Sequence, residues 1–513
     1  MLVRVDSSAI LGVDAYVVEV EVDVAMGMSS FTIVGLPDAA VKESGERVRA
    51  AIRNTGCEFP YNKRITVNLA PADIKKVGPI YDLPIAVGIL GASGQVSREF
   101  LDEMMVVGEL SLDGAVRSVH GVLPMALAAR DSGKKYLVVP QDNTREAAVV
   151  DGIGVYPVGS LTEVMELMED VGSKAPAHVD LGTFDLNRPH YDLDFADVKG
   201  QEHVKRALEV AAAGGHNILM IGPPGSGKTM LARRIPGILP PMNLDEALET
   251  TKLFSVSGRL DSSTSLVTTR PFRSPHHTIS NAGLSGGGTY PQPGEVSLAH
   301  HGVLFLDELP EFRRDVLEIL RQPLEDGHVT ISRVAGSLTY PARFMLVGAM
   351  NPCPCGFFSD PTRPCTCHPG LINKYLQRIS GPLLDRIDIH IEVPRLRDQE
   401  LVNVPTGETS TAIRTRVERA RETQRVRFGS NGAGIYCNAH MGAKQIRQYC
   451  VAKDDVKDLL KTAINQLNLS ARAYDRILKL ARTIADLEGV EDITLAHVAE
   501  AVQYRSLDRK LWG

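Results

Sequence analysis

Residues 222–229 form a loop whose composition is suited to binding phosphate groups. The loop reads, in order, Gly222, Pro223, Pro224, Gly225, Ser226, Gly227, Lys228 and Thr229. It follows an apolar run and precedes a helical stretch, so the pattern predicts a strand, a tight turn and a helix start. Glycines there let successive backbone N–H groups point at an anion. We therefore predict a triphosphate cradle, in which Lys228 reaches the β- and γ-phosphates and Thr229 binds Mg²⁺.

Two acids end a second apolar run further along the chain. Residues 303–306 have the composition of a buried parallel strand, and Asp307 and Glu308 follow directly. Ligands of open α/β sheets bind beyond the carboxyl ends of the strands, so both acids are expected beside the phosphate loop. Asp307 is predicted to hold Mg²⁺, and Glu308 is predicted to polarise the attacking water as a general base. The expected chemistry is hydrolysis of a nucleoside triphosphate.

Three further polar residues have positions that would complete such a site. Asn351 follows the predicted strand 344–349, where its amide can orient the attacking water. Arg386 is predicted to act on a phosphate bound by a neighbouring copy. Arginine suits this role because its fixed, delocalised charge can neutralise the charge that develops on the phosphoryl group. Arg472, which opens a predicted helix at 471–487, is a similar candidate contact.

Four of the seven cysteines gather in a loop rich in proline: Cys353, Cys355, Cys365 and Cys367. Disulfides are not expected in a reducing cytoplasm, whereas four thiolates suit a tetrahedral Zn²⁺ ion. A single residue separates the members of each pair, where zinc sites commonly have two or more. Free thiols in a rigid loop are therefore the alternative to a structural zinc site.

The composition is that of a large globular protein. The chain has 513 residues, 43% hydrophobic content and a formal net charge of −6. That length predicts about three domains, and the charge means that any nucleic-acid contact must come from local patches or a pore. The first residues include acids, and no run of about 18 apolar residues occurs, so a cytoplasmic location without membrane contact is expected.

Four segments follow from the local patterns. Strand-like and helical stretches alternate over residues 1–171, which predicts an α/β domain. Residues 172–192 contain prolines and few large apolar residues, as in a linker. Residues 193–395 alternate apolar strands with helices, which predicts a mainly parallel sheet in a nucleotide-binding core. Residues 396–513 show helical periodicity and are expected to form a helical domain.

Several motifs together resemble the AAA+ ATPases of the magnesium-chelatase-like group. They are the phosphate loop and residues 305–308, 350–352, 383–386 and 470–472. Residues 31–38, 272–277 and 353–356 resemble the bacterial YifB/ComM family more specifically, and the likeness runs almost from end to end. The resemblance implies an AAA+ P-loop core with a helical lid, in a ring, usually hexameric, that hydrolyses ATP between subunits. In its terms Asn351 is similar to sensor 1, Arg386 to the arginine finger and Arg472 to sensor 2.

The N-terminal region resembles the α/β domain of Lon proteases, notably over residues 76–80 and 106–114. By that resemblance Ile80 and Leu123 stand where the protease has its serine nucleophile and its lysine base. Neither side chain can attack a carbonyl group or take up a proton. We therefore expect this domain to be a scaffold or a guide for DNA.

Two segments are candidates for contact with DNA. Residues 329–341 alternate around Ala335 and Gly336, which predicts a hairpin that would carry Arg333 into a pore. Related ATPases touch DNA with such a hairpin, and an ordinary hairpin at a sheet edge is the alternative. The glycine-rich residues 283–294 are either a second pore loop or a passive surface loop.

Two other groups of residues are interpreted as structural. Six arginines between residues 414 and 427 face several directions on a predicted helix, which favours a solvated face. His276 and His277 are adjacent on an extended segment, so their side chains are expected to point to opposite sides. Hydrogen bonding within the loop is favoured for them over metal binding.

The leading hypothesis is an ATP-driven ring motor that acts on branched or single-stranded DNA. The resemblance implies branch migration in recombination or natural transformation, with ATP and Mg²⁺ as cofactors and a structural Zn²⁺ as a further candidate. The alternative is a chelatase-type ATPase that remodels a protein partner without DNA. Stimulation of ATPase activity by DNA at low salt, where phosphate contacts are strongest, discriminates between the two.

Overall fold

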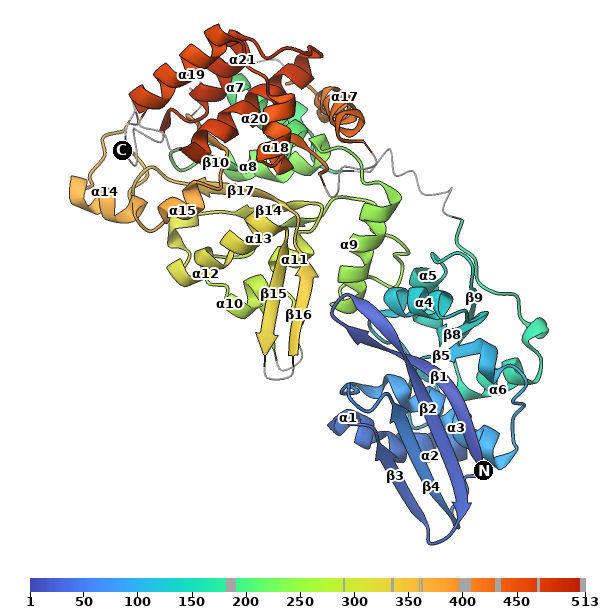
Figure 1. The fold of residues 1–513 in the computed structure, drawn as a ribbon. Coiled ribbons are helices and arrows are strands. Elements are labelled where there is room, and N and C mark those ends of the chain that lie inside the picture. Colours follow the sequence, from blue (N-terminus) through green and yellow to red (C-terminus); the bar gives the residue numbers. More distant parts are fainter. Residues whose placement is uncertain are drawn as a thin grey trace. The chain divides into compact units, whose positions relative to one another are not determined.

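The chain forms two compact α/β units (Figure 1). The computed structural model describes residues 1–180, 191–288, 291–333, 336–358, 360, 363–395, 407–429, 435–467 and 471–507. The first unit comprises Met1–Asp185 and Leu244–Val267, and the second comprises Leu186–Asn243 and Thr268–Gly513. Part of the predicted linker, residues 181–190, lies outside the described residues, as do residues 396–406 at the start of the predicted helical domain.

The first unit is built on a seven-stranded mixed sheet with the order β3-β4-β2-β1-β5-β8-β9. Its strands are β1 (Leu2–Leu11), β2 (Asp14–Met26), β3 (Ser30–Val34), β4 (Lys63–Ala70), β5 (Met104–Val106), β8 (Tyr136–Pro140) and β9 (Gly154–Val158). Strand β2 pairs antiparallel with β1 and β4, and β5, β8 and β9 run parallel to one another. The valines at 18, 20, 22 and 24 of β2 are all buried, so the strand turns every second side chain to the core.

Helices cover this sheet. They include α1 (Ala39–Lys42), α2 (Ser44–Asn54), α3 (Asp82–Ser93), α4 (Val122–Asp131), α5 (Thr144–Ala147) and α6 (Leu161–Glu169). Helix α3 is buried along nearly its whole length, as expected of a helix without a polar face. Ile80 and Leu123 are also buried in this core. The two positions that would carry a Lon-type dyad are therefore occupied by packing residues.

Helix α9 (Leu244–Val256) belongs to the first unit although its neighbours in sequence belong to the second. The Ser255 carbonyl accepts a hydrogen bond from the Gly121 N–H at 3.1 Å, and its hydroxyl donates to the buried Glu146 at 2.6 Å. Lys252 pairs with Asp14 at 3.2 Å. The segment 244–267, which the sequence-based bounds place in the nucleotide-binding core, thus packs with the N-terminal residues.

The second unit contains a five-stranded parallel sheet with the order β11-β14-β17-β10-β18. The strands are β10 (Ile218–Ile221), β11 (Phe272–Arg273), β14 (Val303–Leu306), β17 (Met345–Met350) and β18 (Ile389–Glu392). Every residue of β10, β14 and β17 is buried, which is typical of strands covered on both faces. The predicted parallel sheet is confirmed, with two of its strands at the predicted bounds.

Helices surround this sheet and form the C-terminal part of the unit. Those near the sheet are α7 (Glu202–Gly214), α8 (Lys228–Arg234), α12 (Arg314–Ile319), α13 (Arg321–Asp326), α14 (Pro369–Leu376) and α15 (Gly381–Leu384). The C-terminal helices are α17 (Ser410–Phe428), α18 (Ala443–Tyr449), α19 (Asp454–Leu467), α20 (Ala471–Glu488) and α21 (Leu495–Gln503). The predicted helical character of this region is confirmed in the described residues.

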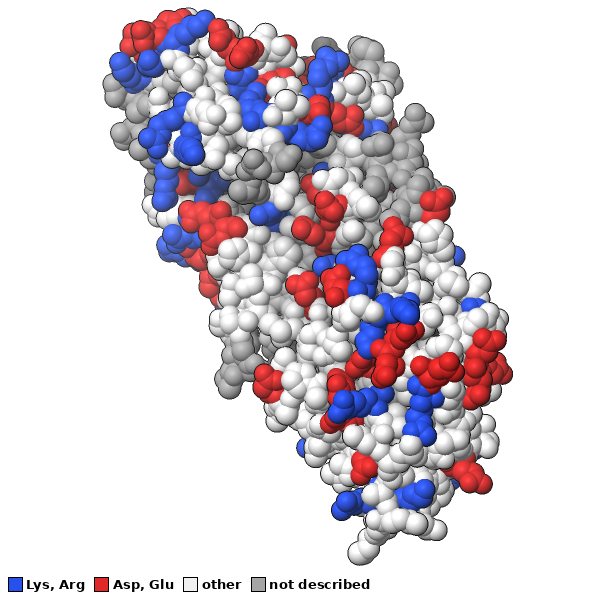
Figure 2. All heavy atoms as spheres, turned by 45° about the vertical axis from the view of Figure 1, so that its right-hand side comes forward, with Lys and Arg blue, Asp and Glu red and all other residues white. Residues whose placement is uncertain are grey.

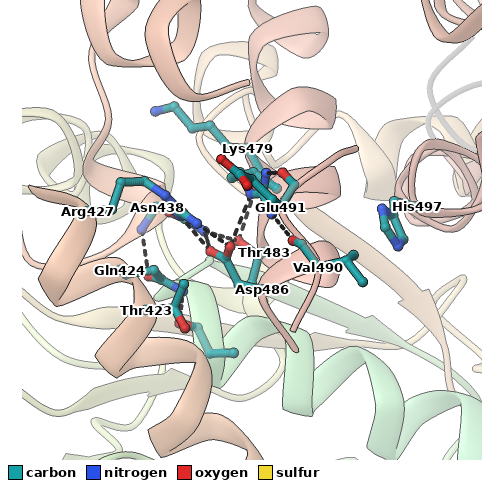
Figure 3. A network of polar contacts seen from close by, with 12 residues as sticks. Thr423, Gln424, Arg427, Asn438, Lys479, Thr483, Asp486, Val490, Glu491 and His497 are labelled. Atoms are coloured by element: carbon teal, nitrogen blue, oxygen red, sulfur yellow. Dashed lines mark hydrogen bonds and ion pairs between the residues drawn. The ribbon is translucent and has the colours of Figure 1, made fainter. Parts of the chain in front are cut away.

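A polar network fixes the C-terminal helices to one another (Figure 3). The buried Asp486 of α20 accepts hydrogen bonds from Arg427 and Asn438, both at 2.8 Å. Asn438 also donates to Thr483 at 3.1 Å, and Thr483 contacts Nε2 of His216 at 2.9 Å. Because His216 lies just before β10, the network anchors the C-terminal helices at the amino end of that strand.

Charges of both signs are interspersed over the face of the protein drawn in Figure 2. This pattern agrees with the small net charge of −6. Among the described residues, no helix has the length and apolar character needed to cross a membrane.

Candidate functional site

The phosphate loop lies between β10 and α8, at the carboxyl edge of the parallel sheet. Gly225 and Gly227 adopt φ values of +76° and +88°, which favour glycine and turn the intervening amides inward. Gly222 has no room for a side chain, because a Cβ atom there would lie 2.1 Å from the Val393 carbonyl oxygen. The loop glycines are therefore required by the geometry.

Lys228 is the buried cation of this loop. Its ammonium group donates to the carbonyl oxygens of Gly222 at 2.7 Å and Pro223 at 2.9 Å. Burial lowers the pKa of Lys228 to about 8, although the charges of Asp307 and Glu308 act in the opposite direction. Within the described chain no carboxylate lies at ion-pair distance from it. A buried ammonium group held by neutral oxygens is suited to receive a phosphate anion.

The acids at the end of β14 lie beside the phosphate loop. The Thr229 hydroxyl donates to a carboxylate oxygen of Asp307 at 2.6 Å, so two oxygens suited to Mg²⁺ are already adjacent. Glu308 has a φ of +52°, an uncommon conformation for a residue with a side chain, and its side chain is 57% exposed. Backbone strain of this kind often marks functional positions.

Asn351 joins the same group. It follows β17, which pairs with β10 in parallel, and its amide oxygen lies 3.4 Å from the Lys228 ammonium nitrogen. The structure therefore brings together Lys228, Thr229, Asp307 and Asn351, which follow the carboxyl ends of three parallel strands. ATP with Mg²⁺ fits this donor set, because it combines a cation, a glycine cradle and oxygen ligands for the metal.

Two residues near this site were not assigned to it from the sequence. Gln201 is buried and donates to the carbonyl oxygens of Ser226 and Pro394, both at 2.9 Å, so it supports the phosphate loop from behind. Nδ1 of His277 lies 3.5 Å from the Glu308 carboxylate. No local sequence pattern relates Gln201 to the phosphate loop or His277 to Glu308.

The prediction for the histidine pair was wrong in one respect. The rings of His276 and His277 lie on the same side of the chain, with their centres 4.1 Å apart, because the segment is not a regular strand. His276 bonds with the Thr278 hydroxyl at 2.9 Å, in agreement with the predicted hydrogen bonding within the loop.

Arg386 lies at the opposite edge of the sheet from Lys228. β18 runs parallel to β10, with Ile389 opposite Ile218, and Arg386 precedes β18. The Asn217 side chain, just before β10, donates to the Arg386 carbonyl at 3.0 Å. A four-residue strand, about 10 Å long, therefore separates Arg386 from the phosphate loop. The arginine does not join the Lys228 group of its own subunit.

The Arg386 guanidinium is buried and has specific partners. It donates to the Pro382 carbonyl at 2.6 Å and forms an ion pair with Glu325 of α13. This guanidinium, with Arg472 and Arg321 further away, holds the pKa of Glu325 below its ordinary value. Arg472 is exposed at the start of α20 and contributes to the same charge group. The two predicted arginines thus lie near a shared carboxylate.

The four clustered cysteines are brought together by the loop after Asn351. All four sulfur atoms lie within 4.8 Å of one another. The thiols are free, and only Cys353 is fully buried. Such a set can hold a single tetrahedral metal ion.

The predicted hairpin is present as β15 (His328–Arg333) and β16 (Gly336–Pro341), and residues 334–335 lie outside the described part. The glycine-rich segment packs against it, since a Cβ atom at Gly286 would lie 2.7 Å from Ile331. The Tyr340 hydroxyl donates to the Pro291 carbonyl at 2.6 Å. The two candidate pore segments therefore form one substructure.

The solvated-face prediction for the arginines of α17 was wrong for several of them. Arg416 pairs with Glu209 and Glu408, and Arg421 donates to the Ala212 carbonyl at 3.1 Å. Arg427 belongs to the network around Asp486. These side chains attach α17 to neighbouring elements because long guanidinium groups reach partners across a helix surface.

Comparisons with known proteins identify the family of the chain. Residues 194–401 match the family "Magnesium chelatase, subunit ChlI", residues 20–143 match "Subunit ChlI of Mg-chelatase", and residues 407–505 match "Magnesium chelatase, subunit ChlI C-terminal". The fold and these matches define an AAA+ ATPase of the magnesium-chelatase-like class.

Relatives similar over the full length narrow the assignment. The chain is 46% identical to "Competence protein ComM" of Haemophilus influenzae, over 99% of this chain and 98% of the relative. It is 45% identical to "Uncharacterized protein YifB" of Escherichia coli, over 99% and 97%. A segment is 27% identical to "Lon protease 2" of Bacillus subtilis, over 32% of each chain. The chain belongs to the YifB/ComM family.

Proposed function

We propose that this protein is a subunit of an ATP-hydrolysing ring motor that moves branched DNA. The observation that carries the ATPase proposal is the convergence of Lys228, Thr229, Asp307 and Asn351 at one sheet edge. Lys228 would bind the β- and γ-phosphates, and Thr229 and Asp307 would hold Mg²⁺, which supplies charge neutralisation when bound. The exposed Glu308 carboxylate would accept a proton from the attacking water, and Asn351 would orient that water.

The ring is proposed from the position of Arg386. A guanidinium at the edge opposite to the phosphate loop can act only on a nucleotide bound by another copy. Arg472 lies near the same carboxylate and would approach the same neighbouring nucleotide. In a closed ring, every subunit gives its Arg386 to one neighbour and receives an arginine from the other. The family resemblance implies a hexamer.

The proposed substrate is DNA, because the β15–β16 hairpin and the glycine-rich segment form one projecting substructure. A competence protein is among the relatives that match over the full length. Branch migration in recombination or natural transformation is therefore the role we propose. The matches to magnesium chelatase subunits favour a second candidate, an ATPase that remodels a protein partner.

The test uses the full-length protein and its Glu308→Gln variant. We expect the variant to bind ATP like the wild type and to lose at least about 100-fold in turnover, because the general base is absent. Branched DNA at low salt should stimulate the wild-type ATPase. A labelled four-way junction should be separated into duplexes by branch migration only when ATP is hydrolysed. Normal turnover in the variant would contradict the role of Glu308. An active ATPase without any DNA binding would favour the protein-remodelling candidate.

We also propose that the four-cysteine cluster holds a structural Zn²⁺ ion, as its donor chemistry favours.

A further inference from the structure

We propose that the zinc-bound cysteine loop is a strut that holds the phosphate loop in its nucleotide-binding shape. This inference rests on the proposed nucleotide site, and it assigns to the cysteine cluster a role in nucleotide affinity. It is carried by two sets of contacts: those among the four sulfur atoms, and those between the cysteine loop and the residues around Lys228.

The sulfur geometry is that of a closed site for one ion. The sulfur of Cys353 lies 3.3 Å from that of Cys355 and 3.7 Å from that of Cys365, and the latter two are 3.5 Å apart. These distances are too long for disulfides, which need about 2.05 Å. A tetrahedron with Zn–S bonds of about 2.3 Å has sulfur atoms about 3.8 Å apart, close to the separations found.

Backbone amides support the sulfur atoms. The Phe358 N–H donates to the sulfur of Cys353 at 3.3 Å, and the Cys367 N–H donates to the sulfur of Cys365 at 3.4 Å. Such outer contacts stabilise thiolate charge and fix the direction of metal ligands. His368 is the next possible ligand in sequence, but its Nδ1 accepts the Gly370 N–H at 3.2 Å as the cap of α14. The four cysteines therefore form a complete set by themselves.

A turn of the cysteine loop packs on the phosphate loop. The Gly356 N–H donates to the Cys353 carbonyl at 2.9 Å, which closes a tight turn between two of the ligands. A Cβ atom at Gly356 would lie 2.5 Å from Cδ of Pro224, so this turn packs directly on the phosphate loop. Gly356 also has a φ of +86°, a conformation that favours glycine.

The other end of the loop begins at the nucleotide site. Asn351, whose amide oxygen contacts Lys228, is separated from Cys353 by one proline. One metal ion would therefore hold both the turn at Gly356, which packs on Pro224, and the end of β17, which precedes Asn351. The segment from Cys353 to Cys367 has 15 residues, and one ion bound by all four thiols would link its two ends.

The first experiment measures zinc content and nucleotide affinity on the same full-length protein. We expect about one zinc atom per chain by mass spectrometry. The dissociation constant of a fluorescent ADP analogue should rise by at least about tenfold in a Cys365→Ser/Cys367→Ser variant that has lost zinc. Cys57→Ser, a free cysteine of the first unit, is the matched control and should change neither quantity. Less than about 0.1 zinc atom per chain in the wild type would overturn the metal site.

A second variant separates the strut from the folding of the loop. Gly356→Ala should keep its zinc but weaken ADP binding, because the new methyl group pushes the turn away from Pro224. Gly489→Ala is the control, since Gly489 also has a positive φ, of +73°, but no neighbour within 4 Å. Unchanged ADP affinity in zinc-bearing Gly356→Ala or in the zinc-free variant would overturn the strut. A zinc-loaded wild type that binds no nucleotide would instead contradict the proposed function.

Discussion

At the residue scale, we expect the buried Lys228 to couple nucleotide binding to proton uptake. Its ammonium group contacts only neutral oxygens, so burial lowers its pKa to about 8, from an ordinary value of 10.5. A bound phosphate reverses this effect, because a neighbouring anion favours the charged lysine. The residue is therefore partly neutral in the nucleotide-free protein above neutral pH and charged in the complex.

We expect Mg²⁺-free ADP to bind with uptake of nearly one proton at about pH 9 and with almost none at about pH 6.5. The dissociation constant should rise by up to about tenfold for each pH unit above 8 and should be flat well below that value. Calorimetry in two buffers with different ionisation enthalpies measures the uptake. A complex that forms at high pH without proton uptake would contradict the lowered pKa of Lys228.

We expect Glu325 to position Arg386, because its carboxylate forms an ion pair with the buried guanidinium. Glu325→Ala should lower kcat by roughly ten- to a hundredfold and leave ADP affinity unchanged, since a misplaced group impairs the transition state more than binding. Glu422→Ala, which removes an exposed pair with Arg425 in α17, is the control. Equal losses in both variants would indicate a general effect on structure rather than the positioning of Arg386.

At the scale of elements, the strands that form the nucleotide site could be predicted from the sequence. The position of Arg386 relative to the phosphate loop could not. The phosphate loop and the end of β14 have strong local patterns, because a buried parallel strand is a continuous apolar run. The place of Arg386 depends on the parallel register of β18 with β10. That register is a long-range property, and so is the contact between His277 and Glu308.

The network around Asp486 connects several C-terminal elements, and its loss should destabilise them. Asp486→Ala leaves the half-buried Arg427 and the buried Arg482 without their carboxylate, which should cost about 3–5 kcal/mol in the free energy of unfolding. Asp492→Ala breaks an exposed pair with Lys453 and should cost less than about 1 kcal/mol. Urea denaturation followed by circular dichroism measures both. Similar small losses would show that the network is not a stabilising centre.

At the scale of the whole molecule, the proposed ring requires two copies of the chain to complete each catalytic site. Each subunit carries Lys228 at one sheet edge and Arg386 at the other. Mixing two inactive variants tests this arrangement, because each supplies what the other lacks. The outcome depends on the interface and not on either subunit alone.

We expect Lys228→Ala and Arg386→Ala to be inactive separately and to regain up to about a quarter of wild-type turnover when mixed in equal amounts, since one interface in four then has both groups intact. The ATPase rate of the mixture, compared with each variant at the same total concentration, is the measurement. Additive, near-zero activity in assembled mixed rings would contradict the proposal that Arg386 acts in trans.

The course of the chain through α9 limits how this protein can be cut into fragments or recombined with related genes. Residues 244–267 leave the second unit, complete the first, and return. A single cut in the chain therefore cannot separate the N-terminal unit from the second unit, because residues 244–267 of the first unit lie within the sequence of the second. A fragment that starts after residue 192 would keep α9 but lose the surface that buries it. Recombination that exchanges one half without the other should yield an insoluble product.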